Sequence, residues 1–198
     1  EMPDLKCVSS DFFFMRRTSE EAVCALIRDL CATRLPQKMG IPTDQIQVLS
    51  PTRKGAVGTV NLNRLLQAAL NPQSPDKKER PYGDYQFREG DRVMQIRNNY
   101  EKDVFNGDIG RVIKIDGKNV TVAFPERPEG DYVTYAKGEV EELQLAYAMS
   151  VHKSQGSEYP YVILLMVQSH YIMLQRNLLY TAVTRAKEKV LIVGSKNA

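Results

Sequence analysis

The stretch LAYAMSVHKSQGSEYPYVILL, at residues 145–165, decides the fold. Two apolar runs, at residues 143–148 and 161–166, are typical of buried strands, and the polar residues 150–159 lie between them. Strands that are buried on both faces belong to a parallel sheet that is covered by helices. We therefore expect an α/β protein in which this polar stretch is a loop at the edge of the sheet, where ligands tend to bind.

Outward from this stretch the sequence alternates strand and helix patterns. Thr18 and Glu21 have the spacing of a capping box, so a helix should start there and end near Leu35-Pro36. Alternating strands and helices predict a parallel sheet with helices on both faces. The other strands are expected at residues 12–15, 46–49 and 190–193, and the other helices at residues 57–70 and 174–186.

A segment of different character interrupts the α/β pattern. Residues 71–88 are rich in Pro, Lys, Asp and Gly and are expected to form a connector. Asn-Gly, Asp-Gly and Pro-Glu-Gly turns separate the short apolar runs that follow, so we expect a small antiparallel β-barrel. Its strands are predicted at residues 93–96, 109–115, 120–124 and 132–135.

The composition excludes several classes of protein. The net charge of +3 over 198 residues is too small to indicate nucleic acid by itself. Three cysteines without a C-x-x-C pattern disfavour a disulfide framework and a zinc site. No apolar run is long enough for a membrane span, and no signal peptide is evident, so we expect no membrane partner and a bacterial cytoplasmic location. Glu1-Met2-Pro3 favours a fragment of a longer protein.

Two segments resemble the fifth and sixth motifs of superfamily 1 helicases, and the form SVHKSQGSEYP resembles the RecD-like branch. They are residues 145–165 and LLYTAVTRAKEKVLIVG at residues 178–194. Three further segments fit that branch, so the resemblance covers nearly the whole chain. These are VLSPTRKG at 48–55, LNRLLQAALNP at 62–72 and GDRVMQIRNNYEKDVFNGDIG at 90–110.

The resemblance implies the C-terminal motor half of an ATP-dependent DNA helicase of the RecD, TraA or exodeoxyribonuclease V alpha subunit type. The implied fold is the second RecA-like domain, of the P-loop-NTPase type, at residues 1–88 and 143–198. The inserted barrel would be Src-homology-3-like (SH3-like) and occupy residues 89–142. Translocation from 5′ to 3′ on single-stranded DNA, in recombination or repair, is the implied activity.

Several residues are candidates for the nucleotide site. The resemblance makes Arg185 the catalytic arginine finger, and a planar guanidinium suits the charge that develops on a γ-phosphate. Gly156 would let the backbone approach a phosphate, Glu158 could accept a hydrogen bond from a ribose hydroxyl, and Gln155 can both donate and accept. The alternatives are a hydrophilic turn with a glycine, and a surface arginine that pairs with Glu188.

Candidate DNA contacts lie in three places. Residues 52–54 follow a strand and precede a helix, so backbone and side-chain donors could point at one phosphate. The alternative for residues 52–54 is a solvated basic turn, and the alternative for the histidine and the tyrosine on the α/β part is packing. In the barrel, basic, amide and aromatic groups occur together as in single-strand binders, but an asparagine-rich turn without a ligand is the alternative. The candidates are Thr52, Arg53, Lys54, Ser150, His152, Lys153 and Thr184, with Tyr180 in support, and in the barrel Arg97, Asn98, Asn99, Tyr100 and Asn106.

The sequence lacks G-x-x-x-x-G-K-[ST] and an Asp-Glu dipeptide. The resemblance implies ATP with Mg²⁺ as the cofactor of the full-length protein, with the Mg²⁺ ligands outside this chain. The chain alone should then be inactive as an ATPase. The implied partners are single-stranded DNA, the missing N-terminal RecA-like domain and RecBC-type subunits. A stand-alone nucleic-acid-binding module without catalysis, or the helicase part of a conjugative relaxase or nuclease complex, is the alternative.

Overall fold

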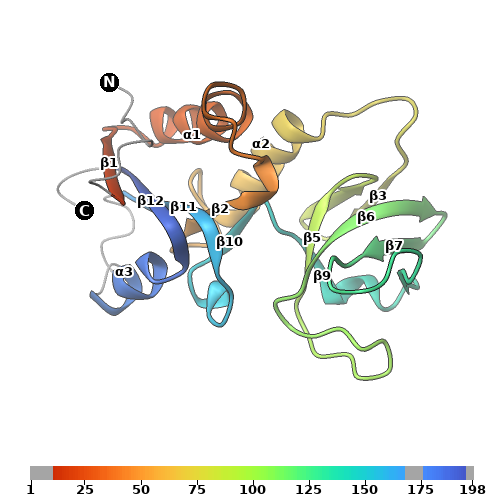
Figure 1. The fold of residues 1–198 in the computed structure, drawn as a ribbon. Helices are drawn as coiled ribbons and strands as arrows, with labels where there is room; N and C mark the ends of the chain where they lie inside the picture. The colour runs from red at the N-terminus through yellow and green to blue at the C-terminus, as the bar shows by residue number, and fades with distance from the viewer. Residues whose placement is uncertain (1–10, 168–175, 195–198) are drawn as a thin grey trace. The chain divides into compact units, whose positions relative to one another are not determined.

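The computed structural model describes residues 11–167 and 176–194. Contacts between these residues divide the chain into two compact units (Figure 1). Unit 1 comprises the described residues up to Leu70 and from Ala148 onward, and unit 2 is Asn71–Tyr147. Unit 2 is therefore wider at both ends than the insertion expected at residues 89–142.

Unit 1 is built on a five-stranded sheet in the order β1-β12-β11-β2-β10. Every neighbouring pair of strands is parallel. The interior strand β2 is buried along its whole length, as a strand covered on both faces must be. The strands are β1 (Phe12–Arg16), β2 (Ile46–Ser50), β10 (Ala148–Ser150), β11 (Tyr159–Met166) and β12 (Ala186–Gly194).

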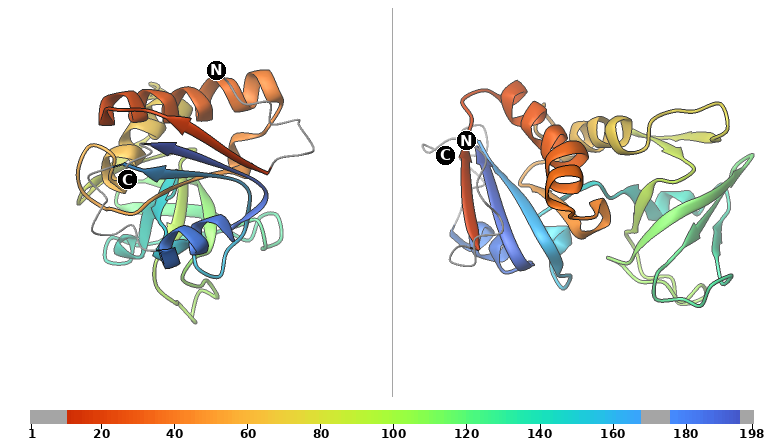
Figure 2. Two further views of the ribbon diagram at one scale, coloured as in Figure 1. Left: turned by 90° about the vertical axis from the view of Figure 1, so that its left-hand side faces the viewer. Right: turned by 45° about the horizontal axis from the view of Figure 1, so that its top comes forward.

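Helices cover both faces of this sheet (Figure 2). The connections through α1 (Glu20–Asp29) and α2 (Thr59–Leu70) run in one direction along the strand order, and that through α3 (Arg176–Val183) runs in the other. Because such crossovers are right-handed, opposite directions place the helices on opposite faces. The predicted α/β fold, a parallel sheet with helices on both faces, is thus confirmed.

The regular secondary structure of unit 2 consists of strands and one short turn of 3-10 helix, η3 (Val140–Glu142). A hairpin of β3 (Glu79–Tyr82) and β4 (Tyr85–Arg88) precedes a five-stranded antiparallel sheet in the order β8-β7-β6-β5-β9. All neighbouring strands of this sheet are antiparallel, as expected for the inserted β segment. Its strands are β5 (Arg92–Gln95), β6 (Ile109–Asp116), β7 (Asn119–Ala123), β8 (Val133–Tyr135) and β9 (Leu143–Leu145).

Both ends of the first helix differ from the prediction. The N-cap is Ser19, whose hydroxyl accepts from the Ala22 amide at 3.1 Å, so the capping box at Thr18 and Glu21 is wrong. The helix also continues past Pro36 as a segment with wide, π-type turns, η1 (Leu30–Lys38). In an α-helix the proline ring would clash with the carbonyl of the residue four positions earlier. The wider turns move that carbonyl away from the ring of Pro36, so the proline does not end the helix.

Two predictions about the joining segments are also wrong. The supposed connector contains the β3–β4 hairpin, whose turn includes Gly83 at φ 55°. The apolar run at 143–148 is not one strand, because it splits into β9 in unit 2 and β10 in unit 1. A continuous apolar run does not show where the chain leaves one sheet for another.

The other predicted elements are present with bounds shifted by a few residues. The helix expected at residues 174–186 is α3, which ends at Val183 because Ala186 already belongs to β12, and the predicted start lies outside the described residues. No helix in the described part of the chain is both long and apolar enough to cross a membrane. The same residues contain no group of three or more His, Cys, Asp or Glu placed to hold a metal ion.

Candidate nucleotide and DNA site

The carboxyl ends of β2 and β10 lie side by side. Their register pairs Ser50 with Ser150, the last residue of each strand. The loop at residues 51–58 therefore leaves the sheet next to the loop at residues 151–158. This end of the sheet, called the carboxyl end below, brings together the candidate DNA residues 52–54 and 150–153.

The loop at residues 51–58 is fixed by its own backbone. The Ser50 hydroxyl donates to the Val57 carbonyl at 2.7 Å and accepts from the Thr52 amide at 3.4 Å. The Gly58 amide donates to the Gly55 carbonyl at 3.1 Å. A Cβ at Gly58 would lie 2.3 Å from the Lys54 carbonyl oxygen, so only glycine fits there. The loop is preorganised, and Arg53 and Lys54 are exposed on it.

The start of α2 does not point its first amides at a ligand, contrary to the expectation for this turn. The Thr59 amide donates to the Thr52 carbonyl at 3.0 Å, and the Val60 amide donates to the Arg53 carbonyl at 3.1 Å. A helix start attracts anions only through donors that remain available. The amides of Thr59 and Val60 are therefore not available to a phosphate.

Positive charge gathers at the carboxyl end of the sheet. Burial, and then the nearby guanidinium of Arg53, lower the pKa of the Lys153 ammonium. Two cations whose charges disfavour each other are stabilised when an anion binds between them. Ser150 is half-buried beside them, and His152 is exposed. These side chains form a basic surface suited to phosphate oxygens.

The second loop begins with a tight turn. His152–Ser154 forms the 3-10 helix η4, and the fully buried Ser154 hydroxyl donates to the Val151 carbonyl at 2.6 Å. Gly156 has φ 86°, a left-handed conformation that favours glycine. Ser154 therefore shapes the loop, while Gln155 and Gly156 are exposed on it.

The same loop then carries the chain to the opposite, amino end of the sheet. Tyr159 at the start of β11 pairs with Ala186 at the start of β12. Glu158 therefore lies at the amino end, away from Ser150. The expectation of one ligand-binding edge is corrected accordingly, because the loop joins two parallel strands of one sheet, β10 and β11, and must run back along the length of that sheet.

Arg185 lies against the end of this loop. Its guanidinium donates to the carbonyls of Thr181 at 3.2 Å and Ser157 at 3.4 Å, and to the Thr184 hydroxyl at 3.3 Å. The Tyr159 amide donates to the Arg185 carbonyl at 2.8 Å. The structure thus places Arg185 against Ser157, which lies between the candidate nucleotide residues Gly156 and Glu158 in the chain.

The neighbouring charges are paired with partners other than Arg185. Lys187 lies 3.3 Å from Glu158. Glu188 accepts from the Tyr161 hydroxyl at 2.5 Å, and this hydrogen bond is the largest cause that raises the Tyr161 pKa to about 12. Glu188 is therefore occupied by Tyr161, and the alternative Arg185–Glu188 pair does not form.

Three of the candidate DNA residues in unit 2 hold their own loop together. Arg97 pairs with Glu141 at 2.8 Å. The Asn98 side-chain oxygen accepts from the Asn106 amide at 3.0 Å. The Asn99 side chain donates to Glu142 at 3.0 Å and accepts from the Lys102 amide at 3.1 Å. These contacts join the loop to Glu141 and Glu142 and use much of the hydrogen-bonding capacity assigned to DNA.

An exposed aromatic pair lies on this loop. Tyr100 is 78% exposed and Phe105 is 40% exposed, and their rings meet edge to face with centroids 5.9 Å apart. Sequence reasoning named Tyr100 and missed Phe105, although Asp-Val-Phe-Asn-Gly places an aromatic ring just before a turn. Tyr180, 72% exposed on α3, is likewise open.

Two family models match the chain. The SH3 domain of ATP-dependent RecD-like DNA helicases matches residues 62–124, and the UvrD-like helicase C-terminal domain matches residues 145–193. The ATP-dependent RecD2 DNA helicase of Deinococcus radiodurans is 40% identical over 153 residues, which cover 77% of this chain and 20% of that protein. The RecBCD enzyme subunit RecD of Mycobacterium tuberculosis is 34% identical over 154 residues, 77% of this chain and 25% of that subunit.

Solved structures with a similar fold include two of the Bacteroides helicase Pif1. Pif1 bound to single-stranded DNA matches with a TM-score of 0.51 and 17% identity, over 74% of this chain and 40% of that one. Pif1 in complex with ADP-AlF3 and single-stranded DNA matches with a TM-score of 0.52 and 18% identity, over 87% and 48%. At these identities the likeness shows the fold alone.

The two matched domains and the fold define the C-terminal part of a superfamily 1 DNA helicase. More narrowly, the chain belongs to the RecD-like family of these helicases. It spans between a fifth and a quarter of the length of the two curated relatives described above.

The contact at Gly58 predicts the effect of one substitution. Gly58→Ala should lower the free energy of unfolding by about 1–3 kcal/mol, because the new methyl group would displace the Lys54 backbone. Gly138→Ala is the control, since a Cβ there meets no heavy atom and should leave the stability within ~0.5 kcal/mol. Urea denaturation measures both, and equal stability of the two variants would contradict the geometry.

Proposed function

We propose that this chain supplies one wall of the ATP site and part of the single-stranded DNA track of a helicase that translocates from 5′ to 3′. In this proposal unit 1 is the second RecA-like domain and unit 2 is its inserted SH3-like barrel. The observation that carries the proposal is the loop at residues 151–158. It begins among the basic side chains of the carboxyl end and finishes beside Arg185 at the amino end.

A loop that touches both sites couples them mechanically. Its first half follows β10 and is pinned by Ser154, and its second half packs against Arg185 through Ser157. A displacement of Ser157 when Arg185 moves toward a phosphate would reach Lys153 within four residues. Coupling of this kind needs contiguous packed elements with two arrangements, and in this proposal the loop would have one arrangement with Arg185 on the Ser157 carbonyl and another with Arg185 on a phosphate.

On the nucleotide side, Arg185 is proposed as the arginine finger. Its three hydrogen bonds, at 3.2–3.4 Å, lie at or beyond the long end of the usual range, so a phosphoryl oxygen would be a stronger partner. Glu158 would accept from the ribose. ATP with Mg²⁺ supplies the phosphoryl group, and the residues that hold the metal are assigned to another domain. The chain alone is therefore expected not to hydrolyse ATP.

On the DNA side, the basic surface at the carboxyl end is proposed to follow the phosphate backbone. Arg53 and Lys153 would contribute charge, and Thr52, Ser150 and His152 would contribute hydrogen bonds. The Tyr100–Phe105 pair would stack on a base. The fold is shared with Pif1, which has been crystallised with single-stranded DNA.

One observation favours a second setting for the same activity. The chain is 34% identical to a part of the RecD subunit of a RecBCD enzyme. In that setting RecBC-type subunits would be partners. Copurification of the full-length protein with other polypeptides at a fixed ratio would support it, and a monomeric active helicase would favour the solitary form.

Salt dependence tests the DNA surface. Single-stranded DNA binding by this chain should weaken steeply as salt rises, because phosphate contacts release counterions. Arg53→Ala and Lys153→Ala should each reduce the slope of log K against log salt concentration by roughly 0.7–1, the loss of one phosphate contact. Fluorescence anisotropy with an oligonucleotide measures the slope.

The control is Lys38→Ala, which removes one positive charge from an exposed lysine that precedes β2 at the amino end of the sheet. It should leave the slope unchanged. Equal slopes for Lys38→Ala and Lys153→Ala would show a non-specific charge effect and would refute the proposed surface.

Arg185→Ala tests the nucleotide side in the full-length protein. DNA-stimulated ATP turnover should fall by roughly 10³-fold or more, while ATP affinity should change far less, because the guanidinium gains most as charge develops on the phosphoryl group. Arg185→Lys should rescue little, since an ammonium lacks the planar set of donors. Single-stranded DNA binding without nucleotide should persist.

Arg64→Ala, an exposed arginine on α2, is the matched control and should retain wild-type turnover. The measurement is steady-state ATPase at saturating DNA, with nucleotide binding followed by a fluorescent analogue. Wild-type turnover in the Arg185→Ala variant would mean that Arg185 is only a surface residue.

A further inference from the structure

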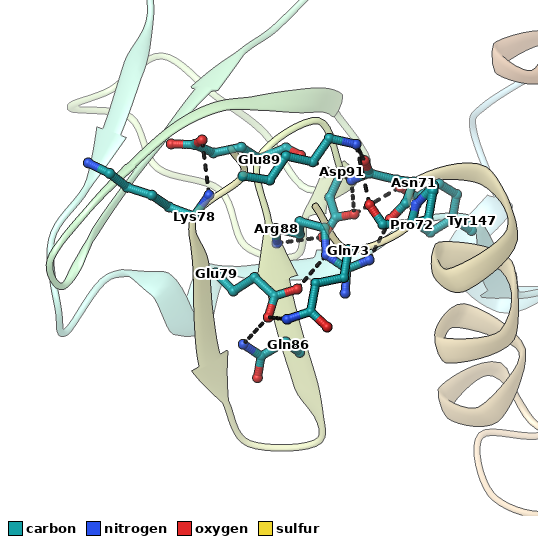
Figure 3. Close-up of polar contacts among 11 residues, drawn as sticks. Asn71, Pro72, Gln73, Lys78, Glu79, Gln86, Arg88, Glu89, Asp91 and Tyr147 are labelled. Atoms are coloured by element: carbon teal, nitrogen blue, oxygen red, sulfur yellow. Dashed lines mark hydrogen bonds and ion pairs between the residues drawn. The ribbon is translucent and has the colours of Figure 1, made fainter. Parts of the chain in front are cut away.

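One buried carboxylate joins the two places where the chain passes between the units. The chain enters unit 2 at Asn71 and leaves it at Tyr147. Asp91, which is fully buried, accepts from the Asn71 side-chain amide at 2.8 Å and from the Tyr147 hydroxyl at 2.9 Å, both on the same oxygen. Figure 3 shows these residues converging on Asp91. Its other oxygen accepts from the Arg88 amide at 2.7 Å.

Further contacts immobilise the entering residue. The Asn71 side-chain amide also donates to the Glu89 carbonyl at 3.1 Å, and the side-chain oxygen of Asn71 accepts from the Lys77 ammonium at 2.5 Å. The Arg88 guanidinium donates to the Asn71 backbone carbonyl and pairs with Glu79 at 2.5 Å (Figure 3). Backbone and side chain of Asn71 are therefore both held within unit 2.

A second polar tie lies just outside the crossings, within unit 1. Asn63 of α2 is buried, and its side chain bonds both backbone groups of Ala148, donating to the carbonyl at 2.8 Å and accepting from the amide at 2.9 Å. Helix α2 and strand β10 are thus tied by Asn63, and the residues that follow and precede them are tied by Asp91.

Strand β10 needs such anchors. It has three residues, lies at the margin of the sheet, and among the described strands pairs with β2 alone. So short an edge strand has few ladder hydrogen bonds to hold its position. Its last residue, Ser150, opens the loop that carries His152 and Lys153. The placement of that loop therefore depends on what holds Tyr147 and Ala148.

We propose that Asp91 is a positioning residue for the DNA contacts that follow β10. This inference rests on the proposed function, since it concerns the same basic surface at the carboxyl end of the sheet. Asp91 touches neither DNA nor nucleotide in this proposal. Its hydrogen bonds fix both the distance and the direction between the entering and leaving segments, which apolar packing would leave less well defined.

Tyr147→Phe tests the proposal with a small change. Asp91→Asn is the obvious variant, but the Asp91 carboxylate accepts from three donors. The new NH2 group would face at least one of these donors, and the variant could fail to fold. Tyr147→Phe removes only one arm of the cluster and keeps the ring. Tyr135→Phe is the matched control, because that buried hydroxyl donates to Gln95 at 2.8 Å away from the crossings. Burial raises the pKa of both phenols.

The two variants should lose similar stability but differ at β10. In Tyr147→Phe, NMR-detected exchange of the β10 amides should accelerate about fivefold, and single-stranded DNA should bind about fivefold more weakly, the equivalent of roughly one net hydrogen bond. In Tyr135→Phe both should match the wild type once stability is taken into account.

Identical β10 exchange and identical DNA affinity in the two variants would reduce Asp91 to a stabilising residue and overturn the proposal. If the wild-type chain does not bind single-stranded DNA, the proposed function fails instead. The exchange comparison then still decides whether Asp91 positions β10, because it requires no DNA.

Discussion

Two parallel strands of one sheet that follow each other along the chain must be joined by a segment that travels back along the length of the sheet. In unit 1 this constraint applies to residues 151–158, which run from the end of β10 to the start of β11. The return is short and contains one turn of 3-10 helix, η4, in place of an α-helix, and it has exposed polar groups at both ends of the sheet. The basic surface and the Arg185 surroundings are connected for this reason, and the proposed coupling follows from topology more than from any single contact.

The arrangement also explains why the candidate residues differ in what they can do. Arg53 and Lys153 both lie at the carboxyl end of the sheet, and burial, followed by the nearby Arg53 guanidinium, lowers the pKa of the Lys153 ammonium. Arg97 and Asn99 have similar chemistry but are bonded to Glu141 and Glu142. The contacts of Arg97 and Asn99 therefore compete with any DNA contact that these two side chains could make.

Much of the fold was predictable, because periodicity reports burial directly. The apolar residues of β2 and β11 predicted central strands, and Arg185 was found through a motif. The β3–β4 hairpin was missed because Pro81 and the charges around it obscure the alternation, and the split between β9 and β10 is invisible in a continuous apolar run. Asp91 was missed for a different reason. In Gly-Asp-Arg-Val it has the composition of a turn, and only the tertiary structure brings Asn71 and Tyr147 to it.

The most direct test of the account is a crystal structure of the full-length protein with single-stranded DNA and a phosphoryl transition-state analogue bound. The account predicts strand phosphates within hydrogen-bond distance of Arg53 and Lys153 at the carboxyl end of the sheet. It also predicts that the Arg185 guanidinium leaves the Thr181 and Ser157 carbonyls for the analogue. A strand bound on another surface, or an Arg185 that keeps those contacts with the analogue in place, would contradict the claim that one loop connects the two sites.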